Sequence, residues 1–325
     1  MGSPRKNKGA LPLLLCAALL FSAIARAAPA LPALPAGAAL HAHIPRATEA
    51  QRGAAFWGVD SAEQRYASAG ELWAAKGEAQ MGPSAQAFYE AREATVKGVT
   101  DLDEAGNALD LAHTASLVRR ALQSSGGSDG SGGGARCLDL CAGIGRVAAG
   151  ALHPAGCAVI DVLEPQAHLL AAAAAALAAR GALGRAFAET AQAHAFPAAA
   201  YDVVHLGWCA QHLSDGDLAG VLRAAAGALA PGGALLWKDN VSDFADVVYG
   251  DAHHTAIRGA AYAGALVALA QPALERVAEE AVPGWPGDLF PYRAWLWVRS
   301  GEWGEVRRAR FAAATAEEAL QEGDL

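Results

Sequence analysis

Residues 138–146, L-D-L-C-A-G-I-G-R, decide how the rest of this chain is interpreted. An apolar run containing Asp139 leads into a turn of small residues, directly after a linker rich in Gly and Ser. A second apolar run, 159–163, is followed by another acid, Glu164. In nucleotide-binding βαβ units, small residues let the backbone approach a ligand and the second acid holds a ribose. We therefore predict such a unit here.

The glycine pattern of this turn bears on which ligand it holds. A-G-I-G-R at 142–146 is not G-x-G-x-x-G, so a dinucleotide is not the first choice. An acid at the end of a strand followed by a short glycine turn is the arrangement that S-adenosylmethionine (AdoMet) enzymes use. Taken alone, the loop also fits an ordinary tight turn between a strand and a helix.

Strand and helix patterns alternate from this loop to near the end of the chain. We expect strands at 136–140, 157–163, 186–190, 201–206, 234–238 and 294–299, and helices at 61–76, 84–96, 108–122, 144–152, 166–180, 215–229 and 257–269. Strands that alternate with helices of about 10–15 residues predict an α/β fold, a parallel sheet covered on both faces. Ligands of such sheets lie beyond the carboxyl ends of the strands.

The composition divides the chain into six segments. They are a signal or targeting leader (1–27), an Ala/Pro-rich linker (28–50), an N-terminal helical segment (51–123), a Gly/Ser loop (124–134), the AdoMet-binding domain (135–305) and an acidic C-terminal tail (306–325). Basic residues before the apolar run 10–25 describe a signal peptide. An organelle-targeting leader and an uncleaved anchor are the alternatives, although the run is shorter than the roughly 20 residues of a membrane span. Localisation therefore stays open.

The charge balance limits the class of partner. The formal net charge is −8. General nucleic-acid binding requires a basic face that meets phosphates, so we expect no nucleic-acid partner. An acidic chain suits a cationic partner instead. We also expect no stable membrane association once the leader is removed, and the composition leaves the oligomeric state open.

The cysteines bear on metal binding and on the redox environment. Cys16 lies in the leader, and Cys137, Cys141, Cys157 and Cys209 lie beside predicted strands or in the loop. The chain has no C-x-x-C pair, which argues against a zinc site, and we expect no bound metal. We expect four buried free thiols rather than a disulfide framework. Free thiols favour a reducing compartment, which conflicts with a secretory leader.

Two further segments point to a family. Residues 207–215 are G-W-C-A-Q-H-L-S-D, and L-A-P-G-G at 229–233 is followed by W-K-D-N at 237–240. Together they form the pattern W-x-x-x-H-L-(S/T)-D, L-x-P-x-G and K-D-N. This pattern resembles the α-N-terminal protein methyltransferases, AdoMet enzymes that methylate the free α-amino group of proteins starting X-Pro-Lys or X-Pro-Arg. The resemblance covers roughly residues 86–300.

The resemblance implies a Rossmann-like class I methyltransferase fold. Such a fold has a central, mostly parallel seven-stranded sheet with helices on both faces, here with an N-terminal helical extension. The implied cofactor is AdoMet, and the implied partners are protein N-termini. The family otherwise works in the cytoplasm and nucleus, which does not settle where a chain with a leader is sent.

The cofactor residues follow from the same resemblance. Cys141, Gly143 and Arg146 match the loop that wraps the methionine end of AdoMet, and an Arg fork suits its carboxylate. Glu164 is expected to hold the ribose hydroxyls, with Asp161 as its competitor.

The adenine region and the far side of the methionine end are also matched. The pair that contacts the adenine corresponds to Ala191 and Gln192. Gly207 occupies the place where family members often carry Gln near the methionine moiety.

The peptide side of the site is assigned in the same way. The resemblance implies a channel built from Trp208, His212 and Asn240, with Tyr89 as the N-terminal aromatic residue and Phe290 as the aromatic residue before Pro291. Asn240 is expected to hydrogen-bond the peptide backbone, and the indole of Trp208 offers a flat apolar wall for Pro and a methylated cation. Trp208 in the core and His212 as a capping or core residue are the alternative interpretations.

Methyl transfer requires an α-amine that has lost its proton. The pKa of such an amine is about 8, so a weak base such as His212 suffices. Family members also use two Asp residues in a D-x-x-D segment, which here matches Gly250 and His253. Asp251 lies between them and serves after a shift of one residue.

Departures from the family pattern keep two other functions open. Cys141 stands where Gly is usual, and residues 100–103 replace the L-G-G-Y-G-H lid segment. The first alternative is a methyltransferase of the same fold that acts on a small amine or another protein site. The second is a non-catalytic binding protein that keeps the AdoMet fold.

Overall fold

The computed structural model describes residues 56–125, 134–269, 274–287 and 289–323. The expected leader (1–27), the expected linker (28–50) and residues 126–133 of the expected Gly/Ser loop lie outside the described residues. In the described ranges, we find no helix with the length and apolar character to cross a bilayer.

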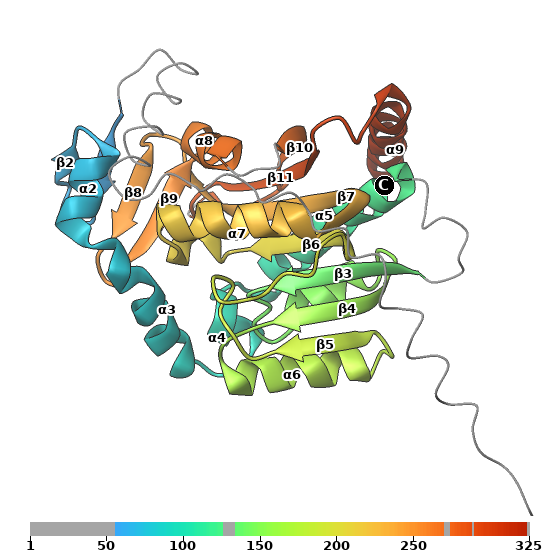
Figure 1. The fold of residues 1–325 in the computed structure, drawn as a ribbon, viewed down its shortest axis with the longest axis horizontal. Helices are drawn as coiled ribbons and strands as arrows, with labels where there is room; N and C mark the ends of the chain where they lie inside the picture. The colour runs from blue at the N-terminus through green and yellow to red at the C-terminus, as the bar shows by residue number, and fades with distance from the viewer. Residues whose placement is uncertain (1–55, 126–133, 270–273, 288, 324–325) are drawn as a thin grey trace, which may run out of the picture. The chain divides into compact units, whose positions relative to one another are not determined.

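A central sheet carries the fold, and its seven core strands appear in the order β5-β4-β3-β6-β7-β11-β10 (Figure 1). They are β3 (Ala135–Leu140), β4 (Cys157–Leu163), β5 (Leu183–Phe187), β6 (Tyr201–Gly207), β7 (Leu229–Ser242), β10 (Leu274–Ala281) and β11 (Tyr292–Arg299). Strands β3 to β7 pair in parallel, whereas β11 is antiparallel to β7 and β10. The expected mostly parallel central sheet is confirmed, and the expected number of seven strands holds for this core.

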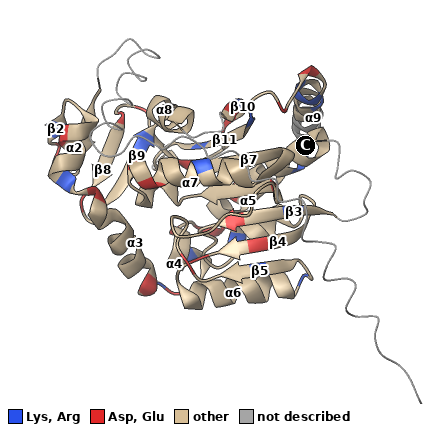
Figure 2. Cartoon of the chain, in the orientation of Figure 1, with Lys and Arg blue, Asp and Glu red and all other residues tan. Residues whose placement is uncertain are grey.

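Helices cover both faces of this sheet, because successive apolar side chains of the buried strands point to opposite faces. On one face, α7 (Asp215–Ala228) and α8 (Ala260–Leu269) share an apolar cluster with Leu138 and Leu206. On the other, Cys137 and Ile160 belong to a cluster with α5 (Glu104–Ser124), α6 (Ala167–Ala178) and the π-helical turn Ala148–Leu152. Most of the sheet is tan in Figure 2, because few charged residues lie along the central strands.

Strand β7 is longer than its expected range of 234–238 and runs beyond the seven-stranded core. Its end pairs with β9 (Thr255–Gly259), which continues through β8 (Val247–Gly250) and β1 (Gly58–Asp60) to β2 (Arg65–Tyr66). The described residues therefore form one sheet of eleven strands, four more than expected.

These additional strands shorten two expected helices. The helix expected at 61–76 begins only at Ala69, as α2 (Ala69–Lys76), where the Ser68 hydroxyl accepts the backbone N–H of Glu71. The helix expected at 257–269 begins at Ala260, because the preceding residues form β9. These short strands pair with near neighbours, β2 with β1 and β9 with β8, and the two hairpins meet where β1 pairs with β8. Because β1 and β8 are remote in sequence, a local apolar pattern does not reveal this pairing.

Smaller differences concern element boundaries. The strand expected at 186–190 is β5, three residues earlier, and the helix expected at 84–96 is α3 (Met81–Glu90), followed by the short α4 (Val96–Thr100). The expected acidic tail (306–325) is largely helix α9 (Glu305–Gly323), which packs against α5. Phe311 explains this difference, since its buried ring lies 5.8 Å from that of Trp303.

Candidate active site

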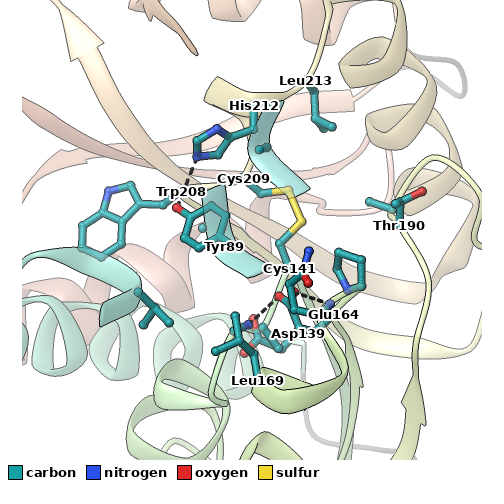
Figure 3. A pocket seen from close by; sticks show the side chains of 18 of the residues that line it. Tyr89, Asp139, Cys141, Glu164, Leu169, Thr190, Trp208, Cys209, His212 and Leu213 are labelled. Atoms are coloured by element: carbon teal, nitrogen blue, oxygen red, sulfur yellow. Dashed lines mark hydrogen bonds between the residues drawn. A yellow bond between two sulfur atoms is a disulfide. The ribbon is translucent and has the colours of Figure 1, made fainter. Parts of the chain in front are cut away.

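A cavity of about 1050 Å³, including its open mouth, lies at the carboxyl ends of β3, β4 and β6. Ten residues expected at the site line it: Tyr89, Cys141, Gly143, Arg146, Glu164, Ala191, Gln192, Gly207, Trp208 and His212. Several of them face one another in Figure 3. The cavity has the place predicted for the ligand of a parallel sheet.

Glu164 connects the end of β4 to the glycine loop. Its Oε2 accepts the N–H of Gly143 at 2.9 Å, and its Oε1 accepts the N–H of Gln166 at 3.0 Å. Burial raises the pKa of Glu164 above its usual range, although both hydrogen bonds oppose this effect. The carboxylate is therefore held in place at the cavity wall before any ligand binds.

Asp161, the competitor of Glu164, is engaged elsewhere. It is fully buried, forms an ion pair with Arg136 at 2.7 Å and accepts a hydrogen bond from the hydroxyl of Tyr201 at 2.9 Å. It does not line the cavity. Of the two acids, only Glu164 is in position to meet a ligand there.

The loop backbone adopts left-handed conformations that suit small residues. Cys141, Gly143 and Gly145 have φ values of 55°, 54° and 72°. At Gly145 a Cβ would lie 2.8 Å from the backbone Cα of Ala173 in α6, so this position also requires glycine for packing.

The expectation of four free thiols is wrong. Cys137 is bonded to Cys157 and Cys141 to Cys209, with Cα–Cα distances of 5.9 and 6.0 Å. Each bond joins strands or strand ends that are neighbours in the sheet but distant in sequence, so spacing alone did not reveal the pairing. The argument for a reducing compartment, which depended on free thiols, no longer holds. Figure 3 shows the second disulfide in the cavity wall.

Arg146 shares a buried acid with a lysine beneath the loop. Its guanidinium lies 2.6 Å from Asp110 Oδ2, donates to Asn107 at 3.0 Å and stacks 5.1 Å from the ring centre of Trp208. Lys238 binds the other oxygen of Asp110. Burial by itself raises the pKa of Asp110, but Lys238 and Arg146 outweigh it and hold that pKa low. Two cations thus contact one carboxylate, so one positive charge is left without an opposite charge. This excess favours the binding of a second anionic group at Arg146.

His212 lies on a segment that Arg258 holds in place. Arg258 donates to the carbonyl oxygens of Ala210 and Leu213, each at 2.7 Å, and its Nε lies 2.9 Å from Asp215. These residues bracket the 3₁₀ turn Ala210–His212. The guanidinium therefore determines where the imidazole points.

The imidazole of His212 contacts Tyr89 and is nearly enclosed. Its Nε2 lies 3.3 Å from the Tyr89 hydroxyl, and its Nδ1 is buried without a hydrogen-bond partner (Figure 3). Burial, together with the nearby His253, lowers the pKa of His212 to about 4. The ring is therefore neutral at physiological pH.

Asn240 and Phe290 do not line the cavity. Asn240 borders a small adjacent hollow of about 200 Å³, together with Asp239 and Arg258. Phe290 is partly exposed, and its carbonyl oxygen accepts the indole N–H of Trp285 at 3.1 Å.

The two candidate bases from the D-x-x-D region also lie outside the cavity. Asp251 lies directly after β8, forms an ion pair with Lys76 at 2.6 Å and accepts a hydrogen bond from the N–H of Ser61. Its carboxylate therefore links α2 to the end of β8. His253 packs on the ring of Phe88, with centroids 4.6 Å apart. The sequence did not reveal that α2 and α3 provide these contacts.

Sequence reasoning missed a buried pair in the cavity wall, Asp139 and His205. Both line the cavity, and Asp139 Oδ1 lies 2.6 Å from His205 Nδ1. The available signal was a polar residue inside the apolar strand Y-D-V-V-H-L, whose partner lies in another strand. Tyr292 was missed as well; it lines the cavity behind Trp208, with ring centres 5.0 Å apart.

Buried acids of the described residues are not grouped for metal binding. In these ranges, no cluster of three or more His, Cys, Asp or Glu side chains is arranged to hold an ion. Asp239 is a different kind of buried acid: burial raises its pKa to about 7, although the N–H of Asn240 donates to it at 2.9 Å.

Comparisons with known proteins agree with this geometry. The model of a family described as AdoMet-dependent proline di-methyltransferase matches residues 77–297. The alpha N-terminal protein methyltransferase 1 of Caenorhabditis elegans is 30% identical over 156 residues, which cover 48% of this chain and 65% of that protein. The protein of the same name from Arabidopsis thaliana is 32% identical over 203 residues, 57% of this chain and 71% of that protein. The match to the nematode protein thus spans slightly less than two thirds of its length.

Solved structures extend the comparison to three dimensions. A SAM-dependent methyltransferase from Leishmania major has a TM-score of 0.66 and 25% identity, over 76% of this chain and 98% of that one. The N-methyltransferase NodS from Bradyrhizobium japonicum, solved with S-adenosyl-L-homocysteine, has a TM-score of 0.50 and 16% identity, over 68% of this chain and 99% of that one. The second likeness shows the fold alone.

Proposed function

This chain belongs to the AdoMet-dependent proline di-methyltransferase family, and we propose that it methylates the free α-amino group of protein N-termini of the X-Pro-Lys/Arg type. One observation carries the proposal. The glycine loop with Glu164 and the wall formed by Trp208, His212 and Tyr89 border the same cavity. A cofactor half and a substrate half are thereby brought within reach of each other.

The residues of the cavity fit AdoMet. Glu164 is a buried acid suited to ribose hydroxyls, the loop backbone at Gly143 leaves room for close approach, and Arg146 carries positive charge that favours a carboxylate. Ala191 and Gln192 border the same space and are assigned to the adenine region. When bound, the cofactor would supply an electrophilic methyl carbon on a sulfonium, and attack on that carbon by a nitrogen lone pair would release the sulfur as the neutral thioether of S-adenosylhomocysteine.

The low pKa of His212 limits its role in the reaction. An α-ammonium has a pKa of about 8, some four units above the value of about 4 for this imidazole. Moving the proton onto His212 would therefore cost about 5 kcal/mol. Near pH 8 about half of the free amine is already neutral, so solvent can remove the proton. We assign His212 the task of orienting the amine by hydrogen bonding, and no role as a proton store.

The aromatic wall supports a proline-containing terminus. Trp208 packs beside Tyr292 and Trp285, at centroid distances of 5.0 and 6.1 Å, so its ring is held rigidly. A fixed indole face suits a proline ring and a methylated ammonium. The net charge of −8 favours a substrate with Lys or Arg near its end.

One observation favours a second candidate function. Asn240, Asp251, His253 and Phe290 do not line the cavity, so the peptide contacts expected of them are not in place at its wall. A methyltransferase of the same fold that accepts a small amine or another protein site would not need these contacts. A non-catalytic binding protein that keeps the AdoMet fold would not need them either, and a lack of AdoMet affinity in calorimetry would favour it.

A peptide panel separates these functions. The purified chain is incubated with methyl-labelled AdoMet and X-Pro-Lys peptides, with N-acetylated copies of the same peptides as controls and small primary amines in parallel. We expect transfer to the free peptides alone. Transfer to small amines but not to peptides would favour the second candidate. Calorimetric binding of AdoMet without transfer to any acceptor would contradict both catalytic functions.

A further inference from the structure

His205 and Asp139 form a buried pair whose direction is determined by chemistry. They are register partners on the adjacent strands β6 and β3, and their side chains are only 3% and 2% exposed. Because a carboxylate only accepts, His205 Nδ1 must donate across the 2.6 Å contact. The other oxygen of Asp139 accepts the N–H of Ala148 at 3.1 Å, so the acid cannot turn away.

The opposite nitrogen of the ring has no partner. His205 Nε2 is buried without a hydrogen bond among the described residues, and His205 lines the cavity. Leaving a buried polar nitrogen unpaired is unfavourable, which indicates that a ligand supplies its partner. In the neutral imidazole, whose one proton lies on Nδ1, Nε2 presents a lone pair, so the missing partner is a donor.

Gly207 has no side chain, and the imidazole of His205 occupies the space where one would lie. A Cβ at residue 207 would lie 2.7 Å from Cε1 and 2.9 Å from Nε2 of His205, closer than such atoms can come. The two positions are therefore coupled: a side chain at 207 is excluded, and the imidazole fills its place in the cavity wall. Since Gly207 also lines the cavity, the ring faces the same ligand space.

We propose that His205, oriented by Asp139, binds the α-ammonium group of AdoMet through Nε2. The inference rests on the proposed function, since it needs AdoMet in this cavity. The charge of Asp139 behind the ring favours a cationic donor over a neutral one. Arg146 provides a cationic position for the cofactor carboxylate, so the carboxylate meets a guanidinium and the ammonium meets an imidazole backed by the charge of Asp139.

Calorimetry with S-adenosylhomocysteine (AdoHcy) and two analogues tests this contact. One analogue lacks the α-amino group and the other lacks the carboxyl group. The wild-type chain should bind AdoHcy roughly tenfold or more tightly than the desamino analogue, the size expected of a hydrogen bond between a charged donor and a buried acceptor.

Two substitutions at one position form a matched pair. His205→Asn keeps an amide that can donate to Asp139 but has no atom at the position of Nε2. His205→Gln extends an amide towards that position. We expect His205→Asn to bind AdoHcy and the desamino analogue equally, and His205→Gln to retain part of the difference. Both variants, like the wild type, should bind the descarboxy analogue less tightly than AdoHcy.

Asp139→Asn provides a second test if the His205 variants unfold. Its amide oxygen can still accept from Ala148, while its NH₂ group faces Nδ1 and moves the imidazole proton to Nε2. AdoHcy affinity should fall, and affinity for the desamino analogue should not. Equal binding of AdoHcy and the desamino analogue by the wild type would overturn the inference, as would an equal loss of both ligands in the variants. Failure of the wild type to bind AdoHcy at all would overturn the proposed function with it.

Discussion

The disulfide between Cys141 and Cys209 joins the glycine loop after β3 to the segment after β6 that carries Trp208 and His212. Both Cys141 and Trp208 have positive φ, 55° and 51°, which non-glycine residues rarely adopt. A covalent bond between the two segments holds these uncommon conformations together. The glycine loop and the segment that carries Trp208 and His212 are thus mechanically linked.

Breaking this bond should therefore weaken cofactor binding. We expect Cys141→Ser with Cys209→Ser to lower AdoHcy affinity several-fold, because the loop loses its attachment. The matched control removes the other disulfide, Cys137–Cys157, which lies in a strand pair away from the cavity lining. That variant should lose about 3 kcal/mol of unfolding free energy but keep its affinity. Calorimetry and chemical denaturation measure the two effects. Unchanged affinity in the first variant would contradict the linkage.

Glu164→Gln should separate cofactor binding from stability. Burial raises the pKa of Glu164, so the charged form is not favoured by the fold itself. The stability that this group contributes is present below its unfolded pKa and is lost as pH rises through the folded one. Gln removes the buried charge, but its one amide oxygen can accept from only one of the two backbone N–H groups that Glu164 binds. These effects oppose each other, so the unfolding free energy at pH 7 should change by no more than about 1–2 kcal/mol, while AdoHcy affinity falls roughly ten- to hundredfold.

Asp161→Asn is the matched control for Glu164. Asp161 is held by Arg136, and its pKa is lowered, so neutralising it should destabilise the fold near pH 7. Because Asp161 lies outside the cavity lining, AdoHcy affinity should stay near that of the wild type. Thermal unfolding and calorimetry on both variants decide the matter. A larger affinity loss in Asp161→Asn than in Glu164→Gln would reverse our assignment of the ribose acid.

The pH profile should report the substrate amine and not His212. Since the pKa of His212 is about 4, its titration falls below the working range. We expect kcat/KM for an X-Pro-Lys peptide to rise about tenfold per pH unit from pH 6 and to level off near pH 8. Initial rates in a series of buffers at constant ionic strength test this. An inflection between pH 6 and 7 that disappears in His212→Asn would show that the imidazole takes the proton.

Asp239→Asn should stabilise the protein in alkaline solution. Burial raises the pKa of Asp239 from 3.8 to about 7, so the folded state disfavours its charge. Its contribution to stability is present below pH 3.8 and is lost as pH rises through 7. At pH 8 the amide should raise the unfolding free energy by about 1–4 kcal/mol, and near pH 3.5 by much less. Denaturation curves at the two pH values measure this, and an equal effect at both would contradict it.

Elements whose signal lies within a few neighbouring residues were predicted, and elements that depend on distant partners were not. The range expected for one strand, 157–163, is that of β4, because an apolar run, interrupted only by Asp161, and its flanking turns lie within a few residues. Strands β1 and β8 were missed because they sustain each other across a long separation, with Gly58 opposite Val247. A three-residue strand has too little periodicity of its own to be recognised.

The candidate site shows the same division. The residues of the glycine loop and of the W-x-x-x-H motif line the cavity because short motifs at strand ends meet at one edge of a parallel sheet. Asp251 was expected beside them, but Lys76 of α2 binds it elsewhere. An element that the sequence does not place in space provides this competing partner.

By itself, the sequence determined most of the core strands along the chain, the glycine loop and the class of cofactor, because periodicity and motif spacing are properties of neighbouring residues. Only the tertiary structure decided which distant side chains meet: Cys141 with Cys209, Asp139 with His205, and Arg146 with Asp110. Such contacts depend on the order of the strands and on how helices and loops pack on them. For Asp139 and His205 they also depend on register, because a shift of one residue would turn either side chain to the opposite face of the sheet.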